Sequence, residues 1–345
     1  MALGFLLAIL RSTGKLSVSK IHRKMQRDYP KLVEDLGGAT YKCVSRAQLV
    51  RILDSFDYRA FNGLNQNYFG QQVGKEGLEW YAVDGKELRG SIDTASGEKR
   101  GENIVLSVNH SSKESEAVGY YSGKKESEKT VARQHFERRP DLSGRAFSFD
   151  ALHNSSDFLA TLEKRNAVYL AQVKSNQKVL MDDLGYVRKN TKPFFEQTTV
   201  EKAHGRIETR KAWCYAVPPG LLDGRWQEAR LATFIYLERE RIQVKNGKTS
   251  WEPVYFASNL PKSPANGEVL FEAVRGHWKV EVNNNIRDSN LGEDRIISRK
   301  QGVQRSLAAF INVAINRLQA INEENNLNIV RENLCEDRDL LYQLF

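Results

Sequence analysis

The sequence predicts an α/β protein with a mixed sheet flanked by helices, a helical N-terminal region and a β-rich insertion. Three observations lead to this prediction. Between residues 78 and 173, strand-like runs alternate with helical segments, which is typical of a mixed sheet with helical connections. Residues 167–173 are almost wholly apolar, as expected of a strand covered on both faces. Residues 178–262 are polar and strand-like, and they interrupt the alternation before the next helix.

The first part of the chain is predicted to be helical. Apolar residues recur at helical spacing in residues 5–9, 17–29 and 44–56, with Ser45 as the expected N-cap of the third helix. Residues 1–60 hold eleven Lys and Arg against five Asp and Glu. This excess indicates either a small DNA-contacting helical domain or a basic, solvated helical surface.

The remaining elements define the predicted domains. Strands are expected at residues 78–83, 103–108, 116–121, 146–149 and 167–173, with helices at 128–138 and 156–165. The insertion shows strand-like pieces at 207–217, 232–237 and 252–257, and an amphipathic helix is expected at 306–318. We therefore predict an N-terminal domain at 1–72, an α/β domain at 73–320 with an insertion at about 178–262, and a C-terminal tail at 321–345.

Charge and cysteine content limit the functional classes. The 345 residues carry a formal charge of +9, which favours a polyanionic partner, either nucleic acid or an acidic membrane surface. The three cysteines form no CxxC pair, so the sequence encodes neither a disulfide framework nor a zinc ribbon and indicates a cytoplasmic protein. The apolar start MALGFLLAIL is too short to span a bilayer and has no preceding charge. We expect a buried first helix there, or a start inside a longer natural N-terminus.

Glu281 is predicted to occupy a helical face that is otherwise apolar. That face follows spacings of three and four residues through Phe271, Val274 and Trp278. A carboxylate on the inward face of a helix is costly unless a metal ion or a cationic group compensates it. The alternative is a surface ion pair with Arg275 or Arg287.

Two aspartates each follow a strand-like run. Asp84 ends the run in WYAVDGK, although an Asp-Gly pair after a strand is also typical of a hairpin turn. Asp150 ends the run in RAFSFDALH, where the alternative is a cap for the next helix. If the two strands are neighbours and the helix of Glu281 packs at the same edge, three carboxylates meet. Such a cluster favours two Mg²⁺ or Mn²⁺ ions and in-line phosphoryl transfer.

The chain resembles the DDE transposases of bacterial insertion sequences, in the branch that includes the H-repeat-associated proteins. The resemblance rests on five blocks in the family's order: AVDGKELRGS (82–91), FSFDALH (147–153), YLAQVKSNQ (169–177), EKAHGRIETR (201–210) and RGHWKVEVNNNIRDSNLGED (275–294). It implies an RNase H-like fold, a β-strand insertion before the last catalytic helix, and a helical N-terminal region associated with the transposase domain. It also implies Asp84, Asp150 and Glu281 as the catalytic, metal-binding triad.

The chain departs from the family pattern after the third carboxylate. The family usually has Ile-Glu-Asn followed by Leu-His-Trp and an Asp, whereas Glu281 is followed here by Val282, and 285–288 read Asn-Ile-Arg-Asp. The family's Lys-Gly-Asn-Gln appears here as Lys-Ser-Asn-Gln, in which Lys174 is the first residue and Asn176 the third. These differences concern positioning around the site, not the three carboxylates.

Basic and polar residues around the predicted site are candidates to support it. Charge makes several of them candidates to hold DNA phosphates near the metals: Lys86, Lys174, His204, Arg206 and Arg210. Within the matched blocks, Asn176, His277 and Trp278 are further supporting candidates. His153, three residues past Asp150, is expected to orient that carboxylate or a water, or to be a plain helix-start histidine. A solvated surface is the alternative for the basic residues.

The leading hypothesis is a transposase that cleaves DNA and joins the freed 3′-hydroxyl to target DNA. Its predicted partners are double-stranded DNA, at the terminal inverted repeats and the target, and a second copy of the chain. Its predicted location is the bacterial cytoplasm at the nucleoid. Two alternatives are a DNA-binding transposase remnant without turnover and a structure-specific DNA nuclease without a joining step.

Overall fold

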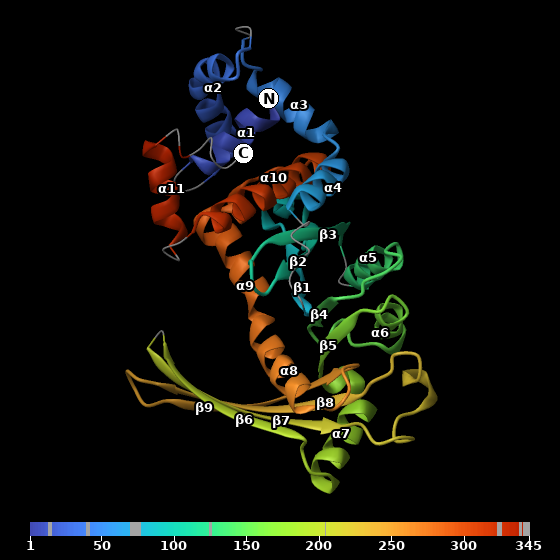
Figure 1. The fold of residues 1–345 in the computed structure, drawn as a ribbon. Helices are drawn as coiled ribbons and strands as arrows, with labels where there is room; N and C mark the ends of the chain where they lie inside the picture. The colour runs from blue at the N-terminus through green and yellow to red at the C-terminus, as the bar shows by residue number, and fades with distance from the viewer. Residues whose placement is uncertain are drawn as a thin grey trace. The chain divides into compact units, whose positions relative to one another are not determined.

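A computed structural model describes residues 1–12, 16–38, 42–69, 77–123, 126–203, 205–322, 326–337 and 340 (Figure 1). The helices are α1 Ala2–Leu10, α2 Val18–Asp35, α3 Arg46–Ser55, α4 Tyr58–Phe69, α5 Glu126–Glu137, α6 Ser156–Glu163, α7 Lys178–Asn190, α8 Pro264–Gly276, α9 Trp278–Asn285, α10 Gln301–Ala320 and α11 Leu327–Glu336. The strands are β1 Glu79–Glu87, β2 Glu102–Asn109, β3 Ser115–Ser122, β4 Arg145–Phe149, β5 Val168–Val173, β6 Phe195–Ala203, β7 Arg206–Ala216, β8 Thr233–Gln243 and β9 Thr249–Ser258. The predicted mixed α/β class is confirmed.

The strands form a mixed sheet in the order β3-β2-β1-β4-β5-β9-β8-β7-β6. Strands β1, β4 and β5 are parallel to one another, and β5, β9, β8, β7 and β6 follow in antiparallel pairs. The chain divides into two compact units. Unit 1 contains residues 1–75, 85–131 and 279–345, and unit 2 contains residues 76–84 and 132–278. The predicted domain boundary at 72/73 lies outside the described residues, and the predicted domains stay predictions.

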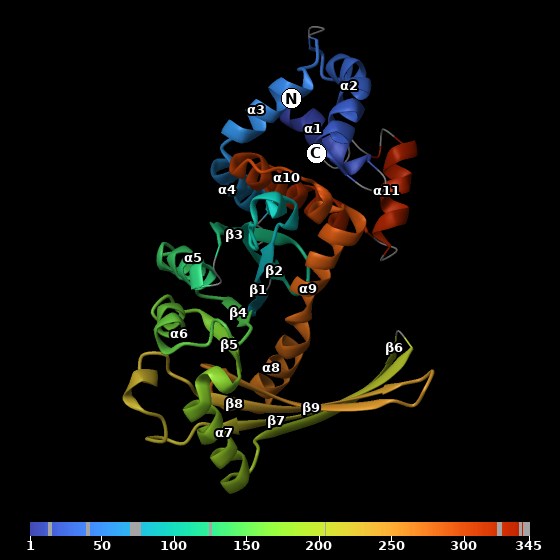
Figure 2. The same ribbon diagram turned by 180° about the vertical axis from the view of Figure 1, so that it is seen from behind.

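Unit 1 is built on one hydrophobic core around α10. The ring of Phe310 on α10 packs against those of Phe5 at 5.0 Å, Phe56 at 5.1 Å and Phe61 at 4.7 Å. Buried residues of α1, α2, α3 and α11 join the same core, and Figure 2 shows α3 and α4 beside α10. The predicted buried first helix is confirmed, because α1 is buried along almost its whole length. Among the described helices, none is long and apolar enough to cross a membrane.

In unit 2, helices cover both faces of the antiparallel strands β6–β9. One face presents Ile235 and Leu237 of β8 to Leu270 and Phe271 of α8, in a single hydrophobic cluster. On the other face, the guanidinium of Arg188 on α7 lies 3.6 Å from the ring centre of Tyr236. Strands alternate their side chains between the two faces, so α7 and α8 lie on opposite sides of these strands, as Figures 1 and 2 show. The predicted β-rich insertion therefore also contains a helix, α7, that was not predicted.

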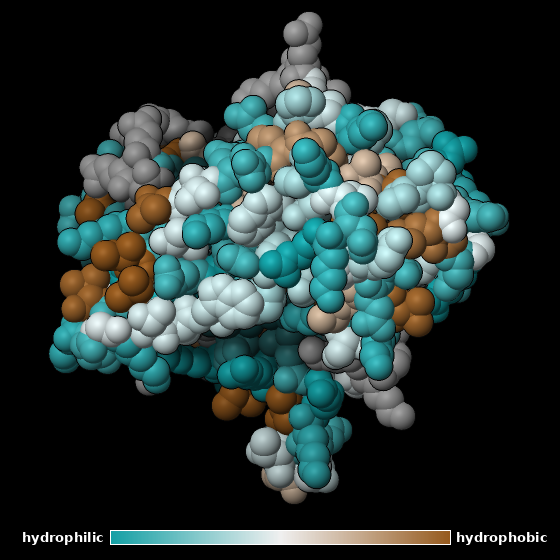
Figure 3. All heavy atoms as spheres, turned by 90° about the horizontal axis from the view of Figure 1, so that it is seen from below, coloured by the Kyte–Doolittle hydropathy of each residue, from teal (hydrophilic) through white to brown (hydrophobic). Residues whose placement is uncertain are grey.

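Beyond the two covering helices, strands β6–β9 continue as an exposed ribbon. Val200 on β6 is 65% exposed and Trp251 on β9 is 57% exposed. Apolar residues on the face of the molecule in Figure 3 lie in several separate groups among hydrophilic ones. The exposed halves of β8 and β9 explain why the predicted strands were shorter than the observed ones, since only the covered halves are apolar.

The predicted apolar stripe around Glu281 is wrong in its second half. Phe271 and Val274 are buried, but Trp278 is 55% exposed and Glu281 is also exposed. The helix is interrupted at His277, between α8 and α9, and α9 buries Val280 and Asn283 instead of Trp278 and Glu281. Because Glu281 is exposed, burial gives no support for a metal ion at this residue.

Candidate metal-binding active site

Asp84 and Asp150 lie side by side on adjacent parallel strands of unit 2. The register pairs Val83 of β1 with Phe149 of β4, so the two aspartates occupy the next position on each strand. Neighbouring strands are about 4.8 Å apart, and residues in one row point to the same face. Both aspartates are half-buried, whereas Val83 and Phe149 are buried on the opposite face. The sheet therefore brings two carboxylates together that are far apart in the sequence.

The hairpin alternative for Asp84 is wrong. Strand β1 continues through Gly85 to Glu87, so Asp84 lies inside the strand and not at its end. A Cβ atom at Gly85 would overlap the carboxylate of Glu128, which is 3% exposed and accepts a hydrogen bond from the Tyr121 hydroxyl at 2.9 Å. Gly85 therefore leaves room for the buried carboxylate of Glu128 and does not form a turn.

The helix-cap alternative for Asp150 is also wrong. The N-cap of α6 is Ser155. The Oδ1 atom of Asp150 instead accepts a hydrogen bond from the backbone N–H of Leu152 at 2.9 Å. This bond turns the chain sharply after β4 and leaves further lone pairs of the carboxylate for other ligands.

The loop after β5 holds the loop that follows Asp150. The Nδ2 atom of Asn176 donates to the carbonyl of Ala151 at 2.7 Å, and Nε2 of Gln177 donates to the carbonyl of Asn154 at 2.8 Å. Because β4 and β5 are parallel, their carboxyl ends meet at one edge of the sheet, where polar sites commonly form. Lys174 is exposed at the end of β5. Asn176 thus positions the backbone next to Asp150.

His277 lies on the same face of the sheet as the aspartates. Its Nδ1 atom is 3.0 Å from the hydroxyl of Ser148, two residues before Asp150 on β4. Burial lowers the pKa of His277 to about 4, although the negative charge of Asp150 acts in the opposite direction. The imidazole is therefore neutral at pH 7, and Glu281 follows it by four residues in the sequence.

The other predicted histidines differ in their surroundings. His153 is fully buried, with its ring 5.6 Å from that of Phe149 and 5.3 Å from that of Phe158. It contributes to an aromatic cluster with Phe149 and Phe158. Its predicted role in orienting Asp150 or a water stays a prediction. His204 lies outside the described residues.

Glu281 belongs to unit 1, in the first turn of α9. The two arginines considered as alternative partners have other carboxylates: Arg275 pairs with Glu201 and Glu272, and Arg287 pairs with Glu293. Within the residues that the structure describes, no group of three or more His, Cys, Asp or Glu side chains has the geometry to hold a metal ion. The structure thus supplies the pair Asp84 and Asp150, and the place of Glu281 in the site stays a prediction.

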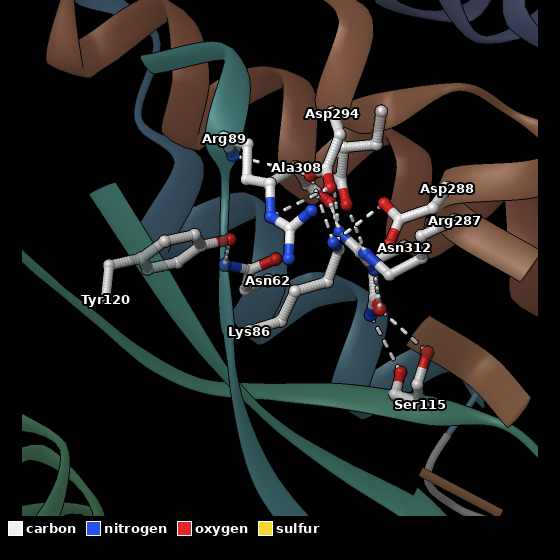
Figure 4. Close-up of polar contacts among 11 residues, drawn as sticks. Asn62, Lys86, Arg89, Ser115, Tyr120, Arg287, Asp288, Asp294, Ala308 and Asn312 are labelled. Atoms are coloured by element: carbon white, nitrogen blue, oxygen red, sulfur yellow. Dashed lines mark hydrogen bonds and ion pairs between the residues drawn. The ribbon is translucent and has the colours of Figure 1, made fainter. Parts of the chain in front are cut away.

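The solvated-surface alternative for Lys86 is wrong, and its predicted contact with a DNA phosphate stays a prediction. It is 7% exposed, and its Nζ atom lies 2.7 Å from a carboxylate oxygen of Asp288 and 3.1 Å from one of Asp294 (Figure 4). Burial raises the pKa of Asp288, and the ammonium of Lys86 acts in the opposite direction. The sequence could not show these ion pairs, because both acidic partners come about 200 residues later in the chain.

Arg287, which the sequence did not single out as a site residue, lies beside this group of charges (Figure 4). It is fully buried and donates two hydrogen bonds of 2.7 Å to the carboxylate of Glu293. It also donates to the side chain of Asn312 and the carbonyl of Ala308, both at 3.1 Å on α10. Arg287 lies in the π-helical turn Ile286–Asn290, a conformation that is often found near functional sites. The arginine therefore fixes the segment after α9 to α10.

Several arginines of the insertion form ion pairs with glutamates. Arg210 lies 2.8 Å from Glu201 and 3.0 Å from Glu208, and Arg206 lies 3.5 Å from Glu208. Glu208 is buried, and Arg239 and Arg241 also approach it at 3.6 Å each. These arginines neutralise a buried carboxylate in the ribbon. Their contact with DNA phosphates stays a prediction.

A mixed sheet flanked by helices, with aspartates on adjacent parallel strands and a helical N-terminal region, is the RNase H-like fold that the resemblance implied. Residues 49–317 match the sequence model of a family described as "Transposase DDE domain", and the chain belongs to this family. Members of this family are DNA-binding nucleases and transesterases that generally depend on divalent metals. The match does not distinguish the H-repeat-associated branch, which stays a prediction.

One similar protein from Escherichia coli O157:H7 is named "Putative transposase YncI". It is 23% identical to this chain over 278 residues, which cover 79% of this chain and 70% of that protein. The similarity extends over most of both chains, in agreement with the family match.

Proposed function

We propose that this protein cleaves DNA at the ends of an insertion sequence and joins the freed 3′-hydroxyl to target DNA. In the first step, a water oxygen forms a bond to phosphorus and the 3′-oxygen leaves. In the second step, that 3′-oxygen forms a bond to a phosphorus of the target DNA, and the 3′-oxygen of the target strand leaves. The observation that carries the proposal is the pair of carboxylates, Asp84 and Asp150, on adjacent parallel strands of a chain from this family.

The donor set fits a divalent cation. Mg²⁺ is commonly bound by one or two carboxylates, together with waters and substrate phosphates. Asp84 and Asp150 would supply these carboxylates, and we propose Glu281 as the third. Two bound Mg²⁺ or Mn²⁺ ions would stabilise charge on the attacking and leaving oxygens. Asn176 and His277 would keep the Asp150 segment in place through Ala151 and Ser148.

The test compares three isosteric variants, Asp84→Asn, Asp150→Asn and Glu281→Gln, with the control Asp182→Asn on the exposed surface of α7. Each protein is incubated with a duplex that carries the element's terminal repeat and with Mg²⁺ or Mn²⁺. We expect the control to cleave at the wild-type rate and each test variant to lose at least about 10³-fold, while DNA binding persists. Cleavage at the wild-type rate by any test variant would remove that residue from the proposed triad.

The products separate transposition from the other hypotheses. A pre-cleaved end supplied with target DNA should give joined strands. Cleavage without joining would identify a nuclease, and salt-sensitive binding without cleavage at any metal concentration would identify a DNA-binding remnant. Because transposition requires two element ends, we also propose that two copies of the chain assemble on DNA.

A further inference from the structure

Unit 1 contains a cavity of about 340 Å³, partly open to solvent, beside α9. Its walls come from α9, the turn after it, the end of α10 and the residue Asn322 that follows, the start of α11, and Lys113 between β2 and β3. This volume lies in the usual range for small-ligand pockets.

The cavity is lined by groups that suit an anion with a hydrogen-bonding edge. Lys113 and Lys279 supply positive charge, and the described lining residues include no carboxylate. Five amide side chains also line it: Asn283, Asn290, Gln319, Asn322 and Asn326. Amides both donate and accept hydrogen bonds, and they commonly pair with the edges of nucleobases. Val282, Ile286 and Leu327 provide apolar contact for a flat ring.

Asn283 points to a ligand rather than to a structural role. It is 2% exposed, yet neither its Oδ1 nor its Nδ2 atom has a hydrogen-bond partner. A buried amide without partners costs about 1–3 kcal/mol. The Oδ1 atom of Asn322, on the same cavity, is also buried without a partner. A ligand in the cavity would satisfy these atoms.

We propose that this cavity binds a nucleotide, with its phosphate at Lys279 and Lys113 and its base edge at Asn283. A free nucleotide and a nucleotide unit of a DNA strand offer the same chemistry. None of the described residues that line this cavity is Asp84, Asp150 or Glu281, the residues proposed to hold the metal ions.

The experiment measures binding in EDTA, so it is independent of metal-dependent cleavage. The probes are the four deoxynucleoside monophosphates, a short single-stranded oligonucleotide and inorganic phosphate, titrated into the full chain. The variants are Asn283→Leu, Lys279→Gln and a control, Lys99→Gln, which removes an exposed lysine that does not line the cavity. Thermal unfolding of each variant is measured in parallel.

We expect Asn283→Leu and Lys279→Gln each to weaken nucleotide or oligonucleotide binding at least about tenfold, with the control unchanged. Asn283→Leu should unfold at the same temperature as the wild type or higher, because it removes two buried unpaired atoms. If the two variants lose monophosphate binding, the ligand is a free nucleotide. If they lose only oligonucleotide binding, the ligand is a nucleotide unit of a DNA strand. Equal binding of inorganic phosphate would refute base recognition. Unchanged binding in both variants, or strong destabilisation by Asn283→Leu, would overturn the proposal.

Discussion

The buried ion pair of Arg287 and Glu293 gives a quantitative test of how unit 1 is held together. Replacing Arg287 with Met leaves the carboxylate of Glu293, which is 3% exposed, without its cation. It also removes the hydrogen bonds to Asn312 and Ala308 on α10. Removing one partner of such a pair typically costs about 3–5 kcal/mol. That loss is a large fraction of the stability of an ordinary domain.

The measurement is urea unfolding of each variant followed by far-UV circular dichroism. Arg287→Lys should still lose stability, because an ammonium cannot form the two parallel hydrogen bonds that the guanidinium makes to Glu293. The matched control is Arg299→Met, which breaks the 2.8 Å pair with Asp93. Arg299 is mostly exposed, so we expect the control to cost at most about 1 kcal/mol.

A double variant isolates the ion pair itself. Replacing both Arg287 with Met and Glu293 with Leu exchanges two buried charges for apolar groups, which is often nearly neutral. We therefore expect the double variant to be clearly more stable than Arg287→Met alone. The reasoning fails if the effects of the two single substitutions simply add, or if Arg287→Met costs no more than the Arg299→Met control.

Three further predictions concern unit 2 and β1. The pKa of His277 is about 4 when folded and near its ordinary value of 6.5 when unfolded. The free energy of unfolding should therefore fall by up to about 3 kcal/mol between pH 6.5 and 4, and pH-resolved urea titrations should show a smaller fall in His277→Gln. Gly85→Ala should lose about 1–3 kcal/mol by overlap with the Glu128 carboxylate, and an unchanged melting temperature would contradict this. Asn176→Ala should lose about 1 kcal/mol with its bond to Ala151 and slow cleavage, and Asn176→Asp should not restore the rate, because a carboxylate has no N–H to donate to that carbonyl; cleavage at the wild-type rate in both variants would count against this positioning role.

The parallel part of the sheet was predictable because its strands carry simple signals. The apolar run of β5 and the short run of β4 are what buried parallel strands require. Asp84 and Asp150 follow comparable runs, and two adjacent parallel strands place such residues in one row. The sequence could therefore identify this pair of carboxylates, although it could not give the register.

The insertion was less predictable because much of it is exposed. The segment that forms α7 is polar overall, and only Leu180, Leu184 and Val187 mark its buried face. Strand β6 alternates half-buried and exposed residues with little apolar character. Tertiary packing, not local preference, fixes these elements, as is common for strands at the edge of a sheet.

Contacts between distant segments were beyond sequence reasoning. The prediction of a buried Glu281 failed because α9 buries Val280 and Asn283, whereas Trp278 and Glu281 are exposed. Lys86 carries the charge expected of a DNA-contacting residue, but its ammonium forms ion pairs with Asp288 and Asp294. Charge shows that a residue needs partners, whereas only the fold shows which partners it has.

A crystal soaked with Mn²⁺ and measured for anomalous scattering tests the proposed active site most directly. We predict Mn²⁺ bound to the carboxylates of Asp84 and Asp150, and its loss from that position in Asp150→Asn. Mn²⁺ bound only elsewhere in the wild-type protein, at concentrations that support cleavage, would contradict the proposal that these two aspartates form the metal site.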